Sequence, residues 1–256
     1  MARERKHPPR KKRRGRFRWI YKLISLVAVV AALVTACVIF FRVNGIHVEG
    51  NSHYTAQDII AASDIEIGDN LVTMWEPDIN QRICGQLPYV QRVVLKRTLP
   101  DQVTLMVMER TVAATIQGDG SSWLLSMDGY LLETTSQNQG MEVVGLQAVS
   151  PKAGQPLEVE EESKSKARAL TRLLSALEEA GKLGECTKVD CSSASHVSVT
   201  YGQHELKFPL YGDYSNMLQL FQAALDSGKV PEGEALIFDF TVADREVYVQ
   251  RPKRVS

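Results

Sequence analysis

The sequence has few of the residues on which disulfide-rich folds and metal sites depend. Four cysteines in 256 residues are too few for a disulfide scaffold, and no Cys-x-x-Cys pair marks a structural zinc site. The five histidines show no His-Glu-x-x-His motif or comparable ligand spacing. We therefore expect no metal site and no cofactor.

Acidic residues are almost missing from the first 22 positions, which hold eleven Lys or Arg residues and a single acid, Glu4. This segment carries a net charge of +10, so the net charge of zero for the whole chain leaves −10 on the other 234 residues. Such strong segregation of charge indicates that the two parts of the chain meet different surroundings.

Charge is absent altogether from residues 23–41, a run of nineteen residues whose only hydroxyl groups belong to Ser25 and Thr35. As a helix this run would be about 28 Å long, close to the roughly 30 Å hydrocarbon core of a bilayer. The positive-inside rule then predicts a single-pass membrane protein with a cytoplasmic tail (residues 1–22) and residues 43–256 outside the cytoplasm.

Two other interpretations of the apolar run are less favoured. A cleaved signal peptide has a shorter apolar core and a small-residue cleavage site, whereas this run ends in large side chains, residues 38–41. Residues 34–37, Val-Thr-Ala-Cys, resemble a lipobox, but the large apolar residues after Cys37 argue against lipidation there.

The basic tail is expected to orient the span and to attract anionic lipid headgroups, at about 1 kcal/mol per residue near the surface. Binding of nucleic acid is disfavoured because no folded nucleic-acid-binding module accompanies the tail. The residues assigned to the membrane surface are Arg10, Lys11, Lys12, Arg13, Arg14, Arg16 and Arg18.

Residues 43–110 have the pattern of a small α+β domain with the order strand, helix, helix, strand, strand. Thr55 and Asp58 form a capping-box pattern before an apolar helix, and Pro77 lies where a second helix would begin. Two alternating strands follow, over residues 90–97 and 102–110. In the second of them Val103, Leu105 and Val107 should face the helices.

This stretch resembles the POTRA domain of the bacterial cell-division family of FtsQ and DivIB. The resemblance rests on the joint spacing of Ile46, Val48, Gly50-Asn51, Ile59-Ile60, Gly68, Leu87-Pro88, Val90, Leu99-Pro100, Val107 and Glu109-Arg110.

Residues 111–250 are expected to form a mixed β domain with two helices, followed by a short C-terminal tail, residues 251–256. The first helix carries leucines at helical spacing and ends at Gly181, and the second spans about residues 214–227. The last two strands are expected at residues 235–240 and 245–250. This outline resembles the β domain of the same family.

No catalytic motif is complete in this sequence. Ser163 and Lys166 match the Ser-x-x-Lys motif of penicillin-recognising enzymes, but neither Ser-Asp-Asn nor Lys-Thr-Gly is present. Cys186 and Cys191 would lie about 16 Å apart along an extended segment, beyond the roughly 7 Å limit for a disulfide unless a turn intervenes. We expect free thiols, no small-molecule substrate and no enzymatic activity.

The resemblance implies a scaffold at the division septum that binds FtsB/DivIC-type and FtsL-type single-pass proteins and helps to control septal peptidoglycan synthesis. The last strand is expected to be an open sheet edge, to which a partner strand can be added. An alternative is a POTRA-bearing component of protein translocation or envelope assembly. The predicted partner-binding residues are Arg245, Glu246, Val247, Tyr248, Val249 and Gln250.

Overall fold

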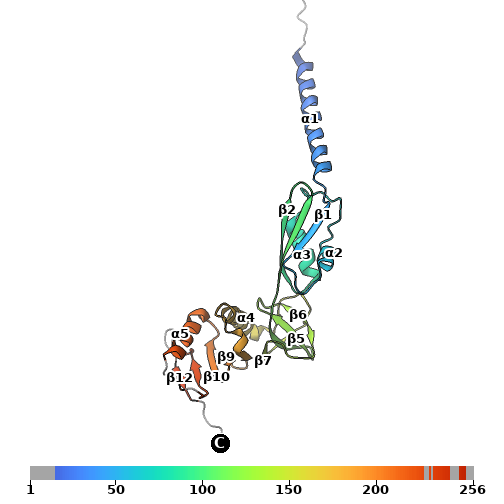
Figure 1. The fold of residues 1–256 in the computed structure, drawn as a ribbon. Coiled ribbons are helices and arrows are strands. Elements are labelled where there is room, and N and C mark those ends of the chain that lie inside the picture. Colours follow the sequence, from blue (N-terminus) through green and yellow to red (C-terminus); the bar gives the residue numbers. More distant parts are fainter. Residues whose placement is uncertain (1–14, 228–230, 232, 243–247, 252–256) are drawn as a thin grey trace, which may run out of the picture.

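The computed structural model describes residues 15–227, 231, 233–242 and 248–251, and its first element is a long helix that projects from the rest (Figure 1). This helix, α1 (Gly15–Phe40), contains a 22-residue apolar stretch, Trp19–Phe40, with no part buried against the protein. A helix of that length covers about 33 Å, slightly more than the hydrocarbon core of a bilayer. Its length and composition therefore indicate single-pass membrane anchoring.

The next part of the chain, which we call the first module, is a three-stranded sheet with two helices on one face. Its sheet has the order β1-β3-β2, with β1 parallel and β2 antiparallel to the central β3. The elements are β1 (Gly45–Glu49), α2 (Ala56–Ser63), α3 (Glu76–Gln86), β2 (Val90–Thr98) and β3 (Gln102–Glu109).

Local sequence signals explain most of these elements. Thr55 and Asp58 form the expected capping box at the start of α2, with the Thr55 hydroxyl accepting a hydrogen bond from the Asp58 amide. Alternation on β3 places Val103, Leu105 and Val107 in the core, at most 5% exposed, as predicted. The α+β class and the order of the elements in the first module are confirmed.

The second module is built on a nine-stranded mixed sheet with the order β12-β11-β10-β9-β8-β7-β4-β5-β6. Three of its pairings are parallel, those of β4 with β7, β7 with β8, and β10 with β11. The strands are β4 (Val112–Gly118), β5 (Ser121–Ser126), β6 (Leu131–Thr135), β7 (Met141–Ala148), β8 (Cys186–Asp190), β9 (His196–Tyr201), β10 (His204–Pro209), β11 (Ile237–Asp239) and β12 (Tyr248–Gln250).

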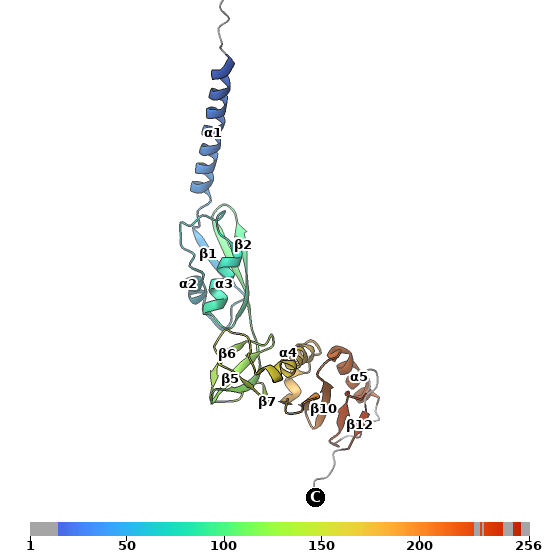
Figure 2. The ribbon, with the colours of Figure 1, turned by 180° about the vertical axis from the view of Figure 1, so that it is seen from behind.

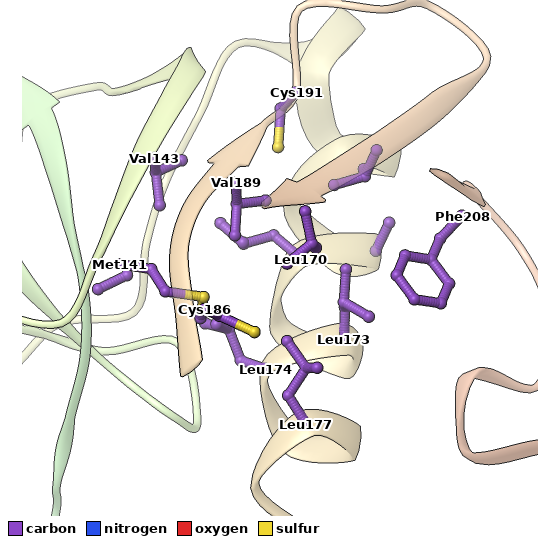
Figure 3. Close-up of a cluster of buried hydrophobic side chains, with 14 of the residues drawn as sticks. Met141, Val143, Leu170, Leu173, Leu174, Leu177, Cys186, Val189, Cys191 and Phe208 are labelled. Atoms are coloured by element: carbon purple, nitrogen blue, oxygen red, sulfur yellow. The ribbon is translucent and has the colours of Figure 1, made fainter. Parts of the chain in front are cut away.

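Two helices, α4 (Lys164–Glu179) and α5 (Tyr214–Asp226), pack against this sheet, and two short 3-10 helices lie at Glu161–Ser163 and Leu183–Glu185. Figure 3 shows the leucines of α4, with Leu170 and Leu173 among them, pointing toward Val189 and Phe208. Each of these four side chains is at most 1% exposed. The helical leucine spacing in the sequence therefore predicted the buried face of α4 correctly.

Cys186 and Cys191 lie in the same core as free thiols. Burial raises the pKa of each thiol to about 12. Because the thiolate is the reactive form, both residues are small apolar core residues of low reactivity.

The two modules meet around Arg110, whose side chain is 6% exposed. Its guanidinium donates to Asp128 Oδ2 at 2.9 Å and to the carbonyl oxygens of Pro88 at 2.9 Å and Val90 at 2.6 Å. It also lies 4.0 Å from the ring centroid of Tyr130. One side chain therefore joins the end of α3 and the start of β2 to the turn between β5 and β6.

Aromatic contacts reinforce this junction. The ring of His53 stacks on that of Tyr89 with centroids 3.7 Å apart, and Tyr89 packs in a small cluster with Leu124 and Leu132. The Tyr89 hydroxyl donates to Glu133 Oε1 at 2.7 Å. Burial and this hydrogen bond raise the pKa of Tyr89. The domain boundaries expected from the sequence remain predictions.

Candidate partner-binding edge of the second module

The candidate site is β12, the strand at one end of the nine-stranded sheet (Figures 1 and 2). β9 and β10 form an antiparallel hairpin, and β11 pairs parallel with β10. β12 then pairs antiparallel with β11, with Ile237 opposite Gln250, Phe238 opposite Val249 and Asp239 opposite Tyr248. The expected pairing of the last two strands is therefore present over Ile237–Asp239 and Tyr248–Gln250, and residues 245–247 of the predicted strand lie outside the described residues.

Buried aromatic side chains hold β11 and so position β12. Phe238 is fully buried and contacts Phe221 of α5 edge to face, with centroids 4.9 Å apart. Just beyond β11, Phe240 is stacked on Phe208 at 5.3 Å. Such pairs contribute about 0.5–1.5 kcal/mol beyond the burial of their area. The strand that supports the edge is thus anchored firmly.

In contrast to β11, β12 is exposed on both of its faces. Tyr248 is 44% exposed, Val249 is 46% exposed, and Gln250 is also exposed. Successive side chains of a strand point to opposite faces of the sheet, so Tyr248 and Gln250 share one face and Val249 lies on the other. A strand added beside β12 would meet an aromatic ring on one face and an aliphatic side chain on the other.

The outer side of β12 carries backbone groups that no other strand of the described chain pairs with, since β12 ends the strand order. Unpaired N–H and C=O groups along a strand are a ready template for another strand. An exposed ion pair lies just beyond the end of β12, where Arg251 Nε is 3.1 Å from Glu234 Oε2. The edge has the features required for strand addition.

The structure describes part of the predicted site. Tyr248, Val249 and Gln250 form β12, whereas Arg245, Glu246 and Val247 lie outside the described residues. At the other end of the chain, Arg16 and Arg18 belong to α1. The remaining predicted membrane-surface residues, Arg10, Lys11, Lys12, Arg13 and Arg14, also lie outside the described residues.

Sequence reasoning missed two features of this edge. The first is Val242, which is 58% exposed just after β11 and adds apolar surface near the edge. The second is the parallel pairing of β10 and β11, which places Phe238 in the core. The apolar alternation of residues 236–240 was the available signal for burial, but nothing in the sequence fixed the direction of pairing.

The sequence raised two other kinds of site, a metal site and the Ser-x-x-Lys pair of Ser163 and Lys166. No group of three or more His, Cys, Asp or Glu side chains among the described residues is placed to hold a metal ion. Ser163 ends a short 3-10 helix, and the ammonium group of Lys166 donates to the carbonyl oxygen of Ser192 at 3.5 Å. The partner-binding role of the exposed edge at β12 stays a prediction.

Residues 41–110 match the family model described as POTRA domain, FtsQ-type. The chain is similar to the cell division protein DivIB of Clostridium botulinum (strain Loch Maree / Type A3), at 27% identity over 139 residues, which cover 54% of this chain and 53% of that protein. DivIB of Clostridium acetobutylicum is 28% identical over 127 residues, covering 49% of this chain and 51% of that protein.

The cell division protein FtsQ of Streptomyces collinus is 26% identical over 133 residues, which cover 49% of this chain and 50% of that protein. The chain therefore spans about half the length of the curated relatives it matches. These likenesses agree with the α+β module that follows α1.

Proposed function

We propose that this chain is a member of the FtsQ/DivIB family of bacterial cell-division proteins and acts as a single-pass, non-catalytic scaffold that binds other division proteins outside the cytoplasm. The observation that carries the proposal is the open edge at β12, in a chain whose relatives are named cell division proteins. Its partners are single-pass proteins of the FtsB/DivIC and FtsL types. Through them it helps to control septal peptidoglycan synthesis.

The proposed orientation places the basic tail in the cytoplasm and both modules outside. It is supported by the net charge of +10 on residues 1–22, next to an apolar helix that carries no charge over residues 23–41. A reporter that is active only outside the cytoplasm should work when fused after Ser256. Activity of a cytoplasmic reporter at that position would show that the orientation is reversed.

The proposed docking mode is strand addition at β12. Main-chain hydrogen bonds to the outer side of β12 supply affinity, and alternate side chains supply specificity. Tyr248 is the expected anchor, because aromatic residues are enriched among the side chains that dominate binding energy. The exposed Val249 on the opposite face adds an aliphatic contact.

The test is capture of the FtsB/DivIC-type partner by the full-length chain in detergent. Tyr248→Ala should cost about 2 kcal/mol of binding free energy, a loss of about 30-fold in affinity. Tyr211→Ala is the matched control, because Tyr211 is also exposed, at 68%, but is remote from β12 in sequence and lies outside the last two strands. Both variants should melt close to wild type, since neither side chain is buried.

Equal affinities for wild type, Tyr248→Ala and Tyr211→Ala would show that the partner docks elsewhere. The wider role has a separate test, the position of a fluorescent fusion in dividing cells. A ring at midcell supports the cell-division role, and a uniform signal around the envelope contradicts it.

A further inference from the structure

Large apolar side chains are exposed at the end of the first module that adjoins α1. Outside α1, only five such side chains in the described chain are more than 60% exposed. Tyr211 of the second module is one of them. The other four, which we call the juxtamembrane face, are Ile67, Val72, Trp75 and Leu99, at 63%, 64%, 65% and 62% exposed.

The loop that carries three of these residues is bonded to the end of α1. The amide nitrogen of Leu71 donates to the carbonyl oxygen of Phe41 at 2.9 Å. The side-chain amide of Asn70 donates to the carbonyl oxygen of Val38 at 3.2 Å and lies 3.5 Å from that of Cys37. Carbonyl groups in the last turn of a helix lack partners within the helix. Asn70 supplies a donor to the carbonyl of Val38, whereas the carbonyl of Cys37 also accepts from the amide of Phe41 at 3.1 Å.

Leu99 is brought to the same end by the turn between β2 and β3. Arg97, near the end of β2, donates to the carbonyl oxygens of Leu71 at 2.9 Å and Met74 at 2.6 Å. Asp101, at the other side of the turn, accepts from the amide of Asn44 at 2.8 Å. The loop before α3 and the β2–β3 turn therefore meet beside the end of α1, where Figures 1 and 2 place the tip of β2.

The contacts of Asn70 fix the depth of this face relative to the apolar helix. Val38 lies two residues inside Phe40, where the apolar stretch ends, which corresponds to about 3 Å along the helix axis. A group bonded to Val38 is therefore level with the outer margin of the segment that would cross the membrane. Val72 and Trp75, whose side chains no other part of the described chain covers, follow Asn70 within five positions.

The chemistry of the face suits the boundary between headgroups and acyl chains. Tryptophan favours that boundary because its ring is apolar and its N–H can still bond to polar groups. The exposed charged residues near the face are of both signs: Arg42 and Lys96 are basic, and Glu66 and Asp69 are acidic. The attraction is therefore apolar rather than selective for anionic lipid.

We infer that the juxtamembrane face inserts into the headgroup region of the leaflet from which α1 emerges, so that the first module rests on the membrane. The inference depends on the proposed membrane anchoring by α1. Two attachments, the helix and the inserted face, then limit how far the first module can tilt. They set the direction in which the second module and β12 extend from the membrane.

The test measures tryptophan fluorescence of the full-length chain in phosphatidylcholine vesicles with and without bromine atoms high on the acyl chains. Trp19→Phe with Trp123→Phe leaves Trp75 as the only tryptophan. Its emission should be about twofold lower in brominated vesicles, because inserted side chains reach the headgroup and acyl boundary. In the matched control all three tryptophans are changed to Phe and Tyr211→Trp is added, and emission should be equal in both vesicles.

Negative charges introduced on the juxtamembrane face should prevent the quenching of Trp75. In the variant whose only tryptophan is Trp75, Ile67→Asp and Val72→Asp should restore the emission of Trp75 in brominated vesicles, because charged side chains are costly to insert into a bilayer. The variant should still fold, since both replaced side chains are exposed and the core stays intact. Unquenched Trp75 in a chain that stays with the vesicles after alkaline washing would overturn this inference alone. A chain that alkaline washing removes would overturn the membrane anchoring as well.

Discussion

The nine-stranded sheet ends in β6 on one side and β12 on the other, and the two edges differ in what lies against them. β6 is covered by the chain itself, because Leu131 donates to the carbonyl oxygen of Gln155 at 2.9 Å and accepts from Gly154 at 2.8 Å. The neighbouring Leu132 is 1% exposed and packs with Tyr89 of the first module. No comparable cover lies over β12 in the described residues, and all three of its side chains are exposed.

This difference shows how the chain leaves one edge available. An open edge exposes a protein to unwanted association, so natural proteins protect edges that have no use. Here the segment after β7 and the junction with the first module together protect β6. The described residues give β12 no similar protection, and this difference supports the proposal that a partner strand is added there.

The largest effect is expected at Arg110, which holds the covered end of the sheet to the first module. Arg110→Ala should reduce the free energy of unfolding by about 3–5 kcal/mol, since it removes the buried member of an ion pair and leaves the partly buried Asp128 carboxylate without its cation. Urea denaturation of the full-length chain in detergent measures this loss. Two carbonyl groups, those of Pro88 and Val90, lose their donor as well.

The control for this prediction is Arg82→Ala. Arg82 and Asp64 form an ion pair at 3.2 Å with side chains 43% and 75% exposed, and exposed pairs contribute about 0–1 kcal/mol. Similar losses for the two variants would mean that Arg110 does not tie the modules together.

A second pair of variants compares the two edges directly. Leu132→Ala on the covered edge should cost about 2–5 kcal/mol, because the side chain is buried between the modules and its removal leaves a cavity. Val249→Ala on the open edge should change stability by less than about 0.5 kcal/mol, because Val249 is 46% exposed. Thermal melting of both variants measures the difference. A costly Val249→Ala would indicate that β12 is packed against something in the folded chain.

Much of the fold follows from local signals in the sequence. The alternation of Val103, Leu105 and Val107 predicted the buried face of β3, and the Thr55–Asp58 capping box predicted the start of α2. The family resemblance, carried by the spacing of glycines, prolines and apolar residues, identified the first module. These signals work because the hydrophobic period and the caps are set by residues close together in the chain.

Contacts between residues far apart in the chain could not be predicted from these local signals. The sequence predicted Arg110 as the last residue of a strand, and no sequence pattern pairs it with Asp128. Nor does any pattern place Tyr89 against Glu133, which lies 44 positions further along the chain. At the candidate site, the position of β12 at the sheet edge was expected, but the parallel pairing of β10 with β11 and the cover over β6 were not. Strand order depends on long-range packing, and a single sequence carries no direct signal for it.

The smallest effect is expected from acidification at the open end of the sheet, where His204 lies on β10. Its Nδ1 atom is buried without a hydrogen-bond partner, and its ring contacts Phe238 edge to face with centroids 5.5 Å apart. Burial lowers the pKa of His204 below the ordinary value of about 6.5. The folded chain therefore keeps this imidazole neutral at pH values where the unfolded chain protonates it.

The sign of the effect follows from proton uptake. Above about pH 6.5 both states are neutral at this position, and His204 contributes no pH dependence. As the pH falls from about 6.5 toward the lower folded pKa, the unfolded state binds more protons, so the free energy of unfolding decreases. His204→Gln removes this contribution. Urea unfolding from about pH 8 to about pH 5 should therefore show the variant gaining stability relative to wild type on acidification. Parallel stability curves for the two chains would show that protonation of His204 is not linked to folding.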